Sequence, residues 1–145
     1  DGQEVSLTKL LQEGALILYF YPADFTPGCT KEACAIRDIH DDILSVGLTV
    51  LGISPQEEDS HRRFKEEHKL PFTLISDPDK VAIKMYDADG PLGYGVRRIT
   101  YLVNQGQKIQ DAVQANLQIG QHTEFIRKAI MLRETAGMKV RPDAD

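Results

Sequence analysis

The hydrophobic positions of this chain follow two patterns: short continuous apolar runs, and longer segments with apolar residues at helical spacing. The run at 15–21 (ALILYFY) lies between Gly14 and Pro22 and is typical of a strand buried on both faces. The predicted strands cover residues 15–21, 48–54, 72–75, 97–103 and 108–113. The predicted helices cover residues 30–46, 56–69, 77–86 and 122–135.

This order of elements predicts an α/β fold with a central mixed sheet and helices on both of its faces. Strand–helix–strand order favours right-handed crossovers onto mostly parallel strands. The turn Asn-Gln-Gly-Gln at 104–107 predicts a late antiparallel hairpin, and residues 87–96 form a Gly-rich loop. We expect one domain over residues 1–136 and a loose tail over 137–145.

Composition and charge exclude several classes of partner. Apolar residues make up 41% and charged residues 27% of the 145 residues, which is ordinary for a soluble globular protein. The net charge is −5 and no basic cluster is present, so we expect no nucleic-acid or anionic-membrane partner. The longest apolar run is far shorter than a membrane span requires.

The cysteine content indicates a reducing compartment. Two cysteines are too few for a disulfide-stapled secreted scaffold, and in a reducing compartment a close pair indicates chemistry more than structure. The chain opens at Asp1 rather than Met, so we expect that it has been trimmed. The expected location is the cytoplasm, or an organelle if a targeting segment was removed.

Cys29 is the first candidate for chemistry because of the residues that precede it. Thr26 is a favoured N-cap and Pro27 a favoured first helical residue, while Gly28 lets another molecule approach the backbone. Cys29 then falls at about the third helical position, where unpaired amides and the helix dipole favour an anion. We expect it to ionise more easily than a free thiol. The alternative is a small, inert buried residue.

Cys34 follows five positions later. On an intact helix two such residues have Cα atoms about 8.6 Å apart, from a 1.5 Å rise and 100° per residue. A disulfide cannot span more than about 7 Å without backbone movement, so this pair could bond only if the first turn or two of the helix unwinds. The alternative is that Cys34 simply packs in the core with Ala33 and Ile36, and both descriptions could hold in different redox states.

Other sites built on these residue types are disfavoured by spacing. Thioredoxin-type reductants use Cys-x-x-Cys, whereas this chain has Cys-x4-Cys. A structural zinc site needs four ligands, and there is no second cysteine pair. The histidines adjoin neither cysteine in sequence, and we predict them to be surface residues rather than ligands or general bases: His40, His61, His68 and His122.

Two motifs resemble a known family. Pro22-x-x-x-Thr26-x-x-Cys29 resembles the peroxidatic motif of the peroxiredoxins, and YFYPADFTPGCTKEACAIRD resembles the bacterioferritin-comigratory protein / PrxQ branch, whose members often have a second cysteine five residues on. The strand that starts at Arg98 (RITYLV) resembles the Arg-x-Thr strand of that branch. The resemblance covers nearly the whole chain. It departs from the branch in lacking an initial Ala-Pro-x-Phe segment and in having Asn104 where Asp is frequent.

The resemblance implies a thioredoxin-like fold and a thiol-dependent peroxidase that reduces hydrogen peroxide and organic hydroperoxides without metal, haem or flavin. It implies that Cys29 is the peroxidatic cysteine and Cys34 the resolving cysteine. The disulfide between them would be reopened by thioredoxin or a similar dithiol donor. The branch includes both monomers and dimers, so a monomer or weak homodimer is expected.

The resemblance also assigns supporting roles around the sulfur. Thr26 and Arg98 would hydrogen-bond the thiolate and the peroxide oxygens. Independently of the resemblance, the amides of Gly28 and Cys29 are further candidates for binding the stretched O–O bond. Pro22 would shield the pocket, and Glu32 would help to hold the arginine.

Strand geometry limits the role to one of Arg97 and Arg98, and the resemblance implies which. Adjacent strand residues face opposite ways, so only one of the two can point at Cys29. The Arg-x-Thr register selects Arg98.

Two other function classes remain open at this stage. One is a redox-regulated binding protein, in which unwinding of the helix on oxidation exposes a partner surface and peroxidase activity is incidental. The other is a generic thiol–disulfide oxidoreductase, which the x4 spacing disfavours.

Overall fold

The strands form one five-stranded sheet in the order β3-β2-β1-β4-β5. The computed structural model describes residues 7–93, 95–116 and 118–135. The strands are β1 Ala15–Phe20, β2 Leu48–Ser54, β3 Thr73–Ser76, β4 Ile99–Val103 and β5 Ile109–Gln114. β1, β2 and β3 run parallel to one another, whereas β4 is antiparallel to both β1 and β5. The predicted mixed sheet and late hairpin are therefore confirmed.

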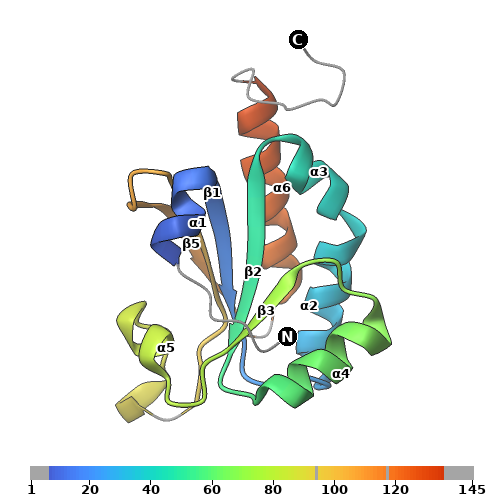
Figure 1. The fold of residues 1–145 in the computed structure, drawn as a ribbon, viewed down its shortest axis with the longest axis vertical. Coiled ribbons are helices and arrows are strands. Elements are labelled where there is room, and N and C mark those ends of the chain that lie inside the picture. The colour runs from blue at the N-terminus through green and yellow to red at the C-terminus, as the bar shows by residue number, and fades with distance from the viewer. Residues whose placement is uncertain (1–6, 94, 117, 136–145) are drawn as a thin grey trace.

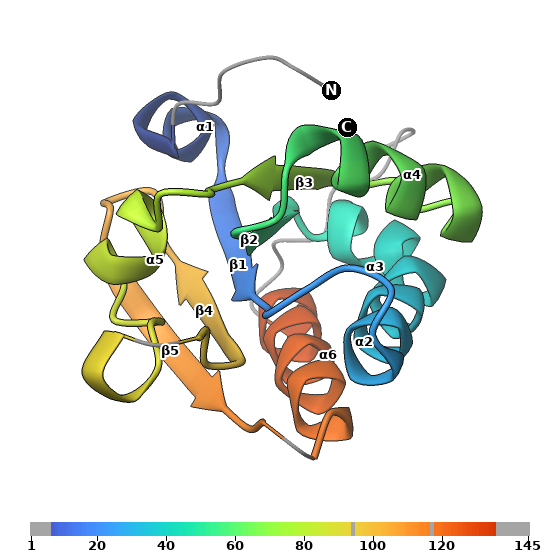
Figure 2. The same ribbon diagram turned by 90° about the horizontal axis from the view of Figure 1, so that it is seen from below.

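Helices cover both faces of this sheet (Figures 1 and 2). They are α1 Leu7–Glu13, α2 Pro27–Asp38, α3 His40–Ser45, α4 Glu58–His68, α5 Val81–Met85 and α6 Gly120–Thr135, with a short 3-10 turn η1 at Pro91–Gly93. α2, α3, α4 and α6 lie on one face, and α1 and α5 on the other.

The continuous apolar run of β1 follows from this layering. Its alternate residues Ala15, Ile17 and Tyr19 join the core cluster that holds the buried side chains of α2, α3, α4 and α6. The residues between them, Leu16 and Leu18 among them, join the cluster under α1 and α5. Since neither face of β1 meets water, the strand has no polar position.

The helices differ from prediction in three places. The helix expected over 77–86 begins only at Val81, after a turn at residues 78–79. The helix expected over 30–46 begins at Pro27 and is divided at Ile39 (φ −114°, ψ 14°) into α2 and α3. Asp41 and Asp42 lie in the first turn of α3, where acidic residues are favourable, so they mark a second start. The short helix α1 was not predicted, because seven residues carry too little periodic signal. The expected tail at 137–145 lies outside the described residues.

Three of the four histidines are buried, so the prediction that all of them lie at the surface was wrong. The exposed fractions are 9% for His40, 3% for His61 and 0% for His122. Charged neighbours in the sequence concealed the direction of His61, which is one turn from the buried Phe64 on α4. The rings of His61 and His122 make hydrogen bonds that bear on the site below.

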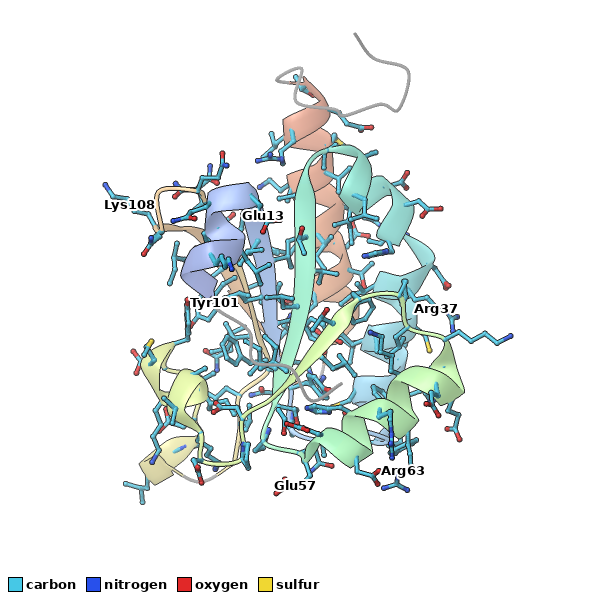
Figure 3. The ribbon with its side chains drawn as sticks, viewed as in Figure 1. Glu13, Arg37, Glu57, Arg63, Tyr101 and Lys108 are labelled. Atoms are coloured by element: carbon cyan, nitrogen blue, oxygen red, sulfur yellow. The ribbon has the colours of Figure 1, made fainter. Side chains whose placement is uncertain are left out.

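Many charged side chains lie on the outside of these layers. Glu57, Arg63 and Lys108 are examples, and all three are exposed (Figure 3). Within the part of the chain that the structure describes, no helix combines the length and the apolar character that a membrane crossing demands.

Gly52 in β2 leaves room for the buried ring of Tyr19, its partner on β1. A Cβ at position 52 would lie 2.8 Å from Tyr19 Cζ and from its hydroxyl oxygen, and 2.8 Å from a methyl carbon of Leu74. We expect Gly52→Ala to lower the free energy of unfolding by about 1–3 kcal/mol, measured by urea denaturation. Gly120→Ala is the control, because a Cβ there meets nothing within 4 Å. Equal stability of the two variants would contradict this account.

Candidate active site

Cys29 lies in the first turn of α2, immediately after the loop that leaves β1. Thr26 is the N-cap and Pro27 the first helical residue, which makes Cys29 the third, as predicted. The Thr26 side chain does not cap the helix, because its Oγ1 donates to the carbonyl of Ala23 at 3.0 Å. The amides of Gly28 and Cys29 belong to the first turn, where no carbonyl four residues back is available within the helix. They remain directed toward the helix start.

Arg98 contacts Cys29 and Glu32 at once. Its Nη2 donates to Cys29 Sγ at 3.2 Å, and its Nη1 donates to Glu32 Oε1 at 2.7 Å. Arg98 directly precedes β4, and the antiparallel register pairs Ile99 with Phe20 at the end of β1. This register carries the guanidinium to the carboxyl end of β1, where α2 begins.

The Arg98 backbone is also fixed. Its amide donates to Asn116 Oδ1 at 2.9 Å, and its carbonyl accepts from the amide of Ala115 at 3.1 Å. These two bonds join the residue to the segment that follows β5. The side chain therefore extends toward α2 from an anchored position.

The three interacting side chains are almost entirely buried: the exposed fractions of Cys29, Glu32 and Arg98 are 1%, 0% and 6%. Burial alone would lower the pKa of Arg98, but Glu32 and Cys29 raise it above its ordinary value, so the guanidinium stays charged. Burial raises the pKa of Glu32 to about 7, against the lowering effect of Arg98. A buried cation thus faces the sulfur beside a carboxyl group that ionises only near neutrality.

Gly28 permits the close approach of the guanidinium. A Cβ at this position would lie 3.3 Å from Arg98 Nη2 and 3.6 Å from Ile119 Cδ1. The first of these distances is tighter than ordinary van der Waals contact. A side chain at position 28 would therefore push Arg98 away from Cys29.

The structure brings some of the predicted site residues together and leaves others apart. Arg98, rather than Arg97, contacts Cys29. Gly28 and Glu32 adjoin that contact. Pro22 is exposed at the start of the loop, and the Thr26 hydroxyl is turned toward the Ala23 carbonyl rather than toward the sulfur.

Both cysteines are free thiols in this structure, with Cys29 buried and Cys34 half-buried. They lie on one continuous helix, α2. In the described part of the chain, no group of three or more His, Cys, Asp or Glu side chains could hold a metal ion. The arrangement around Cys29 therefore consists of a thiol, a guanidinium, a carboxyl group and first-turn amides.

Sequence reasoning missed two residues behind Glu32. His122 Nδ1 lies 3.6 Å from Glu32 Oε2 and 2.7 Å from Thr100 Oγ1, while His122 Nε2 lies 2.8 Å from the Ala115 carbonyl oxygen. Thr100 could have been found, because it is two residues from Arg98 and therefore on the same face of the strand. Nothing in the sequence indicates that His122 reaches this point.

Sequence reasoning also missed Asp24, which holds the loop before Cys29. Asp24 is buried, and its carboxylate accepts from Tyr21 Oη and Ser60 Oγ and contacts His61 Nδ1, each at 2.7 Å. Burial alone would raise the pKa of Asp24, but the hydrogen bonds with His61, Tyr21 and Ser60 lower it below its ordinary value. The loop is therefore tied to α4 by a buried carboxylate.

Comparison with known proteins decides the family. The profile of the AhpC/TSA family matches residues 1–112. A Coxiella burnetii protein named as a peroxiredoxin bcp is 40% identical over 111 residues, which cover 72% of this chain and 73% of that protein. The chain belongs to the peroxiredoxin family, in its bacterioferritin-comigratory protein / PrxQ branch. Rice chloroplastic peroxiredoxin Q is 42% identical over 111 residues, which cover 76% of this chain and 51% of that protein.

Solved peroxiredoxins have the same fold. Mycobacterium tuberculosis peroxidoxin BcpB matches with a TM-score of 0.83 and 29% identity, over 90% of this chain and 87% of that one. A cysteine-to-serine mutant of Xylella fastidiosa PrxQ matches with a TM-score of 0.83 and 25% identity, over 92% of this chain and 86% of that one. Membership of this family supports a thiol-dependent peroxidase activity for the chain.

At the active site, one prediction concerns Arg98, whose planar guanidinium presents two nitrogens in a fixed geometry. Lysine is a point charge and cannot bond Cys29 and Glu32 through two fixed nitrogens. We expect Arg98→Lys to lower the second-order rate constant with hydrogen peroxide by about 100-fold. The matched control Arg97→Lys should stay within about twofold of the unsubstituted chain. An equal loss of the rate constant in both variants would contradict a specific contribution of Arg98 to the reaction.

A second prediction concerns stability and pH. Because the pKa of Glu32 rises from 4.5 to about 7 on folding, its ionisation destabilises the fold progressively across that interval. Glu32→Gln removes this effect. The unfolding free energy of the variant, relative to the unsubstituted peroxiredoxin, should therefore rise by on the order of 2–3 kcal/mol between those pH values. Urea denaturation at several pH values measures the difference, and a difference independent of pH would disagree with the buried carboxyl.

Proposed function

We propose that this peroxiredoxin reduces hydrogen peroxide and organic hydroperoxides through a Cys29 thiolate. The observation that carries the proposal is the Arg98 guanidinium 3.2 Å from Cys29 Sγ. A cation at this distance favours the ionised sulfur. It also lies where it can bind the oxygens of a peroxide that approaches the sulfur.

In the first step the Cys29 thiolate attacks one peroxide oxygen and the O–O bond breaks. Cys29 is oxidised to a sulfenic acid, and the leaving oxygen takes a proton and departs as water or an alcohol. An easily formed thiolate is abundant but less nucleophilic, so ionisation alone does not give a fast reaction. The additional rate must come from groups that bind the stretched O–O bond more strongly than the intact peroxide.

We assign that binding to Arg98 and to the first-turn amides of Gly28 and Cys29. The Thr26 hydroxyl could join them after leaving the Ala23 carbonyl, to which it now donates. In this proposal Glu32 holds the guanidinium in place.

The site also needs protection from water. Pro22 lies in the loop between β1 and Cys29 and is exposed. We assign to it the shielding of the sulfur once a peroxide is bound.

In the second step Cys34 attacks the oxidised sulfur of Cys29. The S–O bond breaks, water leaves and a disulfide forms. On the intact α2 the two Cα atoms are about 8.6 Å apart, beyond the roughly 7 Å limit of a disulfide. The first turn of α2 therefore has to unwind before this bond can form.

An external dithiol then reduces the disulfide by thiol–disulfide exchange and is itself oxidised. We propose thioredoxin or a similar protein as this donor. Such a donor requires a reducing compartment, either the cytoplasm or an organelle, and the rice relative is named as chloroplastic.

Two cysteine variants test the cycle. Cys29→Ser should abolish peroxide consumption, because no thiolate remains beside Arg98. Cys34→Ser should react with the first equivalent of peroxide at the normal rate but should not turn over, because its sulfenic acid cannot form the intramolecular disulfide and a second equivalent of peroxide oxidises it to sulfinic acid. Single-turnover thiol loss and a thioredoxin-coupled assay measure the two steps, and mass spectrometry should find sulfinic acid on Cys29 of the second variant.

Retained activity in Cys29→Ser would overturn the assignment of the peroxidatic cysteine. Thioredoxin-dependent turnover of Cys34→Ser at the unsubstituted rate would exclude Cys34 from the cycle and leave the first step intact.

A further inference from the structure

One oxygen of the Glu32 carboxyl group has a hydrogen-bond partner and the other has none. Oε1 accepts from Arg98 at 2.7 Å, whereas Oε2 is fully buried and has no hydrogen-bond partner. His122 Nδ1 lies 3.6 Å from Oε2, within ion-pair range but beyond a hydrogen bond. Burying an ionised carboxylate oxygen without a hydrogen-bond donor costs free energy. The protonation state of Glu32 therefore depends on what His122 presents to Oε2.

Two fixed partners determine what His122 presents to that oxygen. Nε2 lies 2.8 Å from the Ala115 carbonyl, which can only accept, so Nε2 carries a hydrogen. Nδ1 lies 2.7 Å from Thr100 Oγ1, and in the neutral ring its lone pair accepts the hydroxyl hydrogen. Burial lowers the pKa of His122, and the positive charge of Arg98 lowers it further, against the hydrogen bond to Ala115, so the ring is neutral.

Glu32 Oε2 therefore faces a lone pair and not a proton. An ionised Oε2 would meet no donor, and burying an unpaired charge costs far more than burying a neutral hydroxyl group. The neutral acid is the form that the surroundings favour. The rise in the pKa of Glu32 to about 7, caused by burial, agrees with this conclusion.

The charge on Glu32 matters because the Arg98 guanidinium hydrogen-bonds both Glu32 and Cys29. The titratable or charged groups around Glu32 come from every packed element: Cys29 on α2, Arg98 before β4, His122 on α6 and Tyr19 on β1. With Glu32 neutral, one cation faces one anion, the Cys29 thiolate. With Glu32 ionised, the same cation is shared between two anions.

We propose that Thr100 and His122 are positioning residues: the Thr100 hydroxyl holds the His122 ring so that Glu32 remains mostly neutral up to about neutral pH, which leaves the charge of Arg98 to the Cys29 thiolate. This inference rests on the proposed function, because it describes how the same thiolate is stabilised. It also gives a purpose to the threonine of the Arg-x-Thr segment, whose hydroxyl does not touch the sulfur.

The test compares two substitutions at position 100. Thr100→Val keeps the shape of the side chain and removes the hydroxyl, which frees Nδ1 to take the proton of Glu32. Thr100→Ser keeps the hydroxyl and is the matched control. Both are compared in the reduced full chain, isotope-labelled for NMR of the histidine ring nitrogens and the glutamate carboxyl carbons, with His122→Gln and Glu32→Gln used to assign the signals.

The NMR measurement reads protonation independently of activity. In the unsubstituted chain and in Thr100→Ser we expect His122 as the neutral Nε2–H tautomer and Glu32 ionising near neutral pH. In Thr100→Val we expect Glu32 to ionise at least roughly one pH unit lower. A His122 that carries hydrogen on Nδ1 in the unsubstituted chain, or an unchanged Glu32 titration in Thr100→Val, would overturn the proposal.

The kinetic measurement asks whether Thr100 acts through Glu32. At neutral pH Thr100→Val should react with hydrogen peroxide about tenfold more slowly than Thr100→Ser. In the Glu32→Gln background, where no charge can develop, the two substitutions should give equal rates. Equal rates in the unsubstituted background, or a tenfold difference that persists with Glu32→Gln, would contradict the inference.

These outcomes separate the inference from the proposed function. If Cys29→Ser still consumes peroxide, the function fails whatever position 100 does. If Cys29→Ser is inactive and Thr100→Val matches Thr100→Ser, the inference alone fails. Should Thr100→Val not fold, the tautomer of His122 and the titration of Glu32 in the unsubstituted chain decide the matter.

Discussion

A guanidinium buried between a sulfur and a carboxyl group is the interaction on which the rest of this site depends. Burying a charge costs several kcal/mol unless it is paired and hydrogen-bonded. Arg98 meets both conditions with two residues of α2, Cys29 and Glu32, three positions apart on one helix face. The antiparallel pairing of β4 with β1 brings the arginine to the start of that helix, and Gly28 leaves it the space. The contact between Arg98 and Cys29 therefore depends on the strand pairing, on the helix position of Cys29 and on the absence of a side chain at Gly28.

The loop before Cys29 is held in place, whereas the first turn of α2 has to move in the proposed cycle. The preceding loop is held by Asp24, whose buried carboxylate bonds to Tyr21, directly after β1, and to Ser60 and His61 of α4, so the start of the helix stays in place. The first turn of α2 must unwind in the proposed cycle, and Arg98 is the contact that restrains its sulfur. In that cycle, oxidation of a Cys29 thiolate to a sulfenic acid would remove the negative charge that attracts the guanidinium. The restraint on Cys29 would therefore weaken at the step at which movement is required.

The parts of this picture that were predictable from sequence are those encoded locally. A continuous apolar run gave β1, and the Thr-Pro-Gly segment placed Cys29 in a first helical turn. The residues that were missed are joined across long separations: Asp24 meets His61, 37 positions away, and Thr100 meets His122 through a pairing of β4 with α6. Charged neighbours made His61 look solvent-exposed, and polar neighbours did the same for His122. Periodicity reports which face of an element is apolar, but it does not report a polar group that is buried because a distant partner satisfies it.

The central claim is that the surroundings of Cys29 accelerate the cleavage of an O–O bond beyond what ionisation of the sulfur provides. The most direct measurement is the rapid-mixing rate of the reduced chain with hydrogen peroxide, compared with a free thiol at the same thiolate fraction. The chain contains no Trp, so the reaction is followed by quenching and counting the remaining thiols. The account predicts a rate constant per thiolate at least about 100-fold above that of the free thiol. A rate constant no larger than that of the free thiol would contradict it.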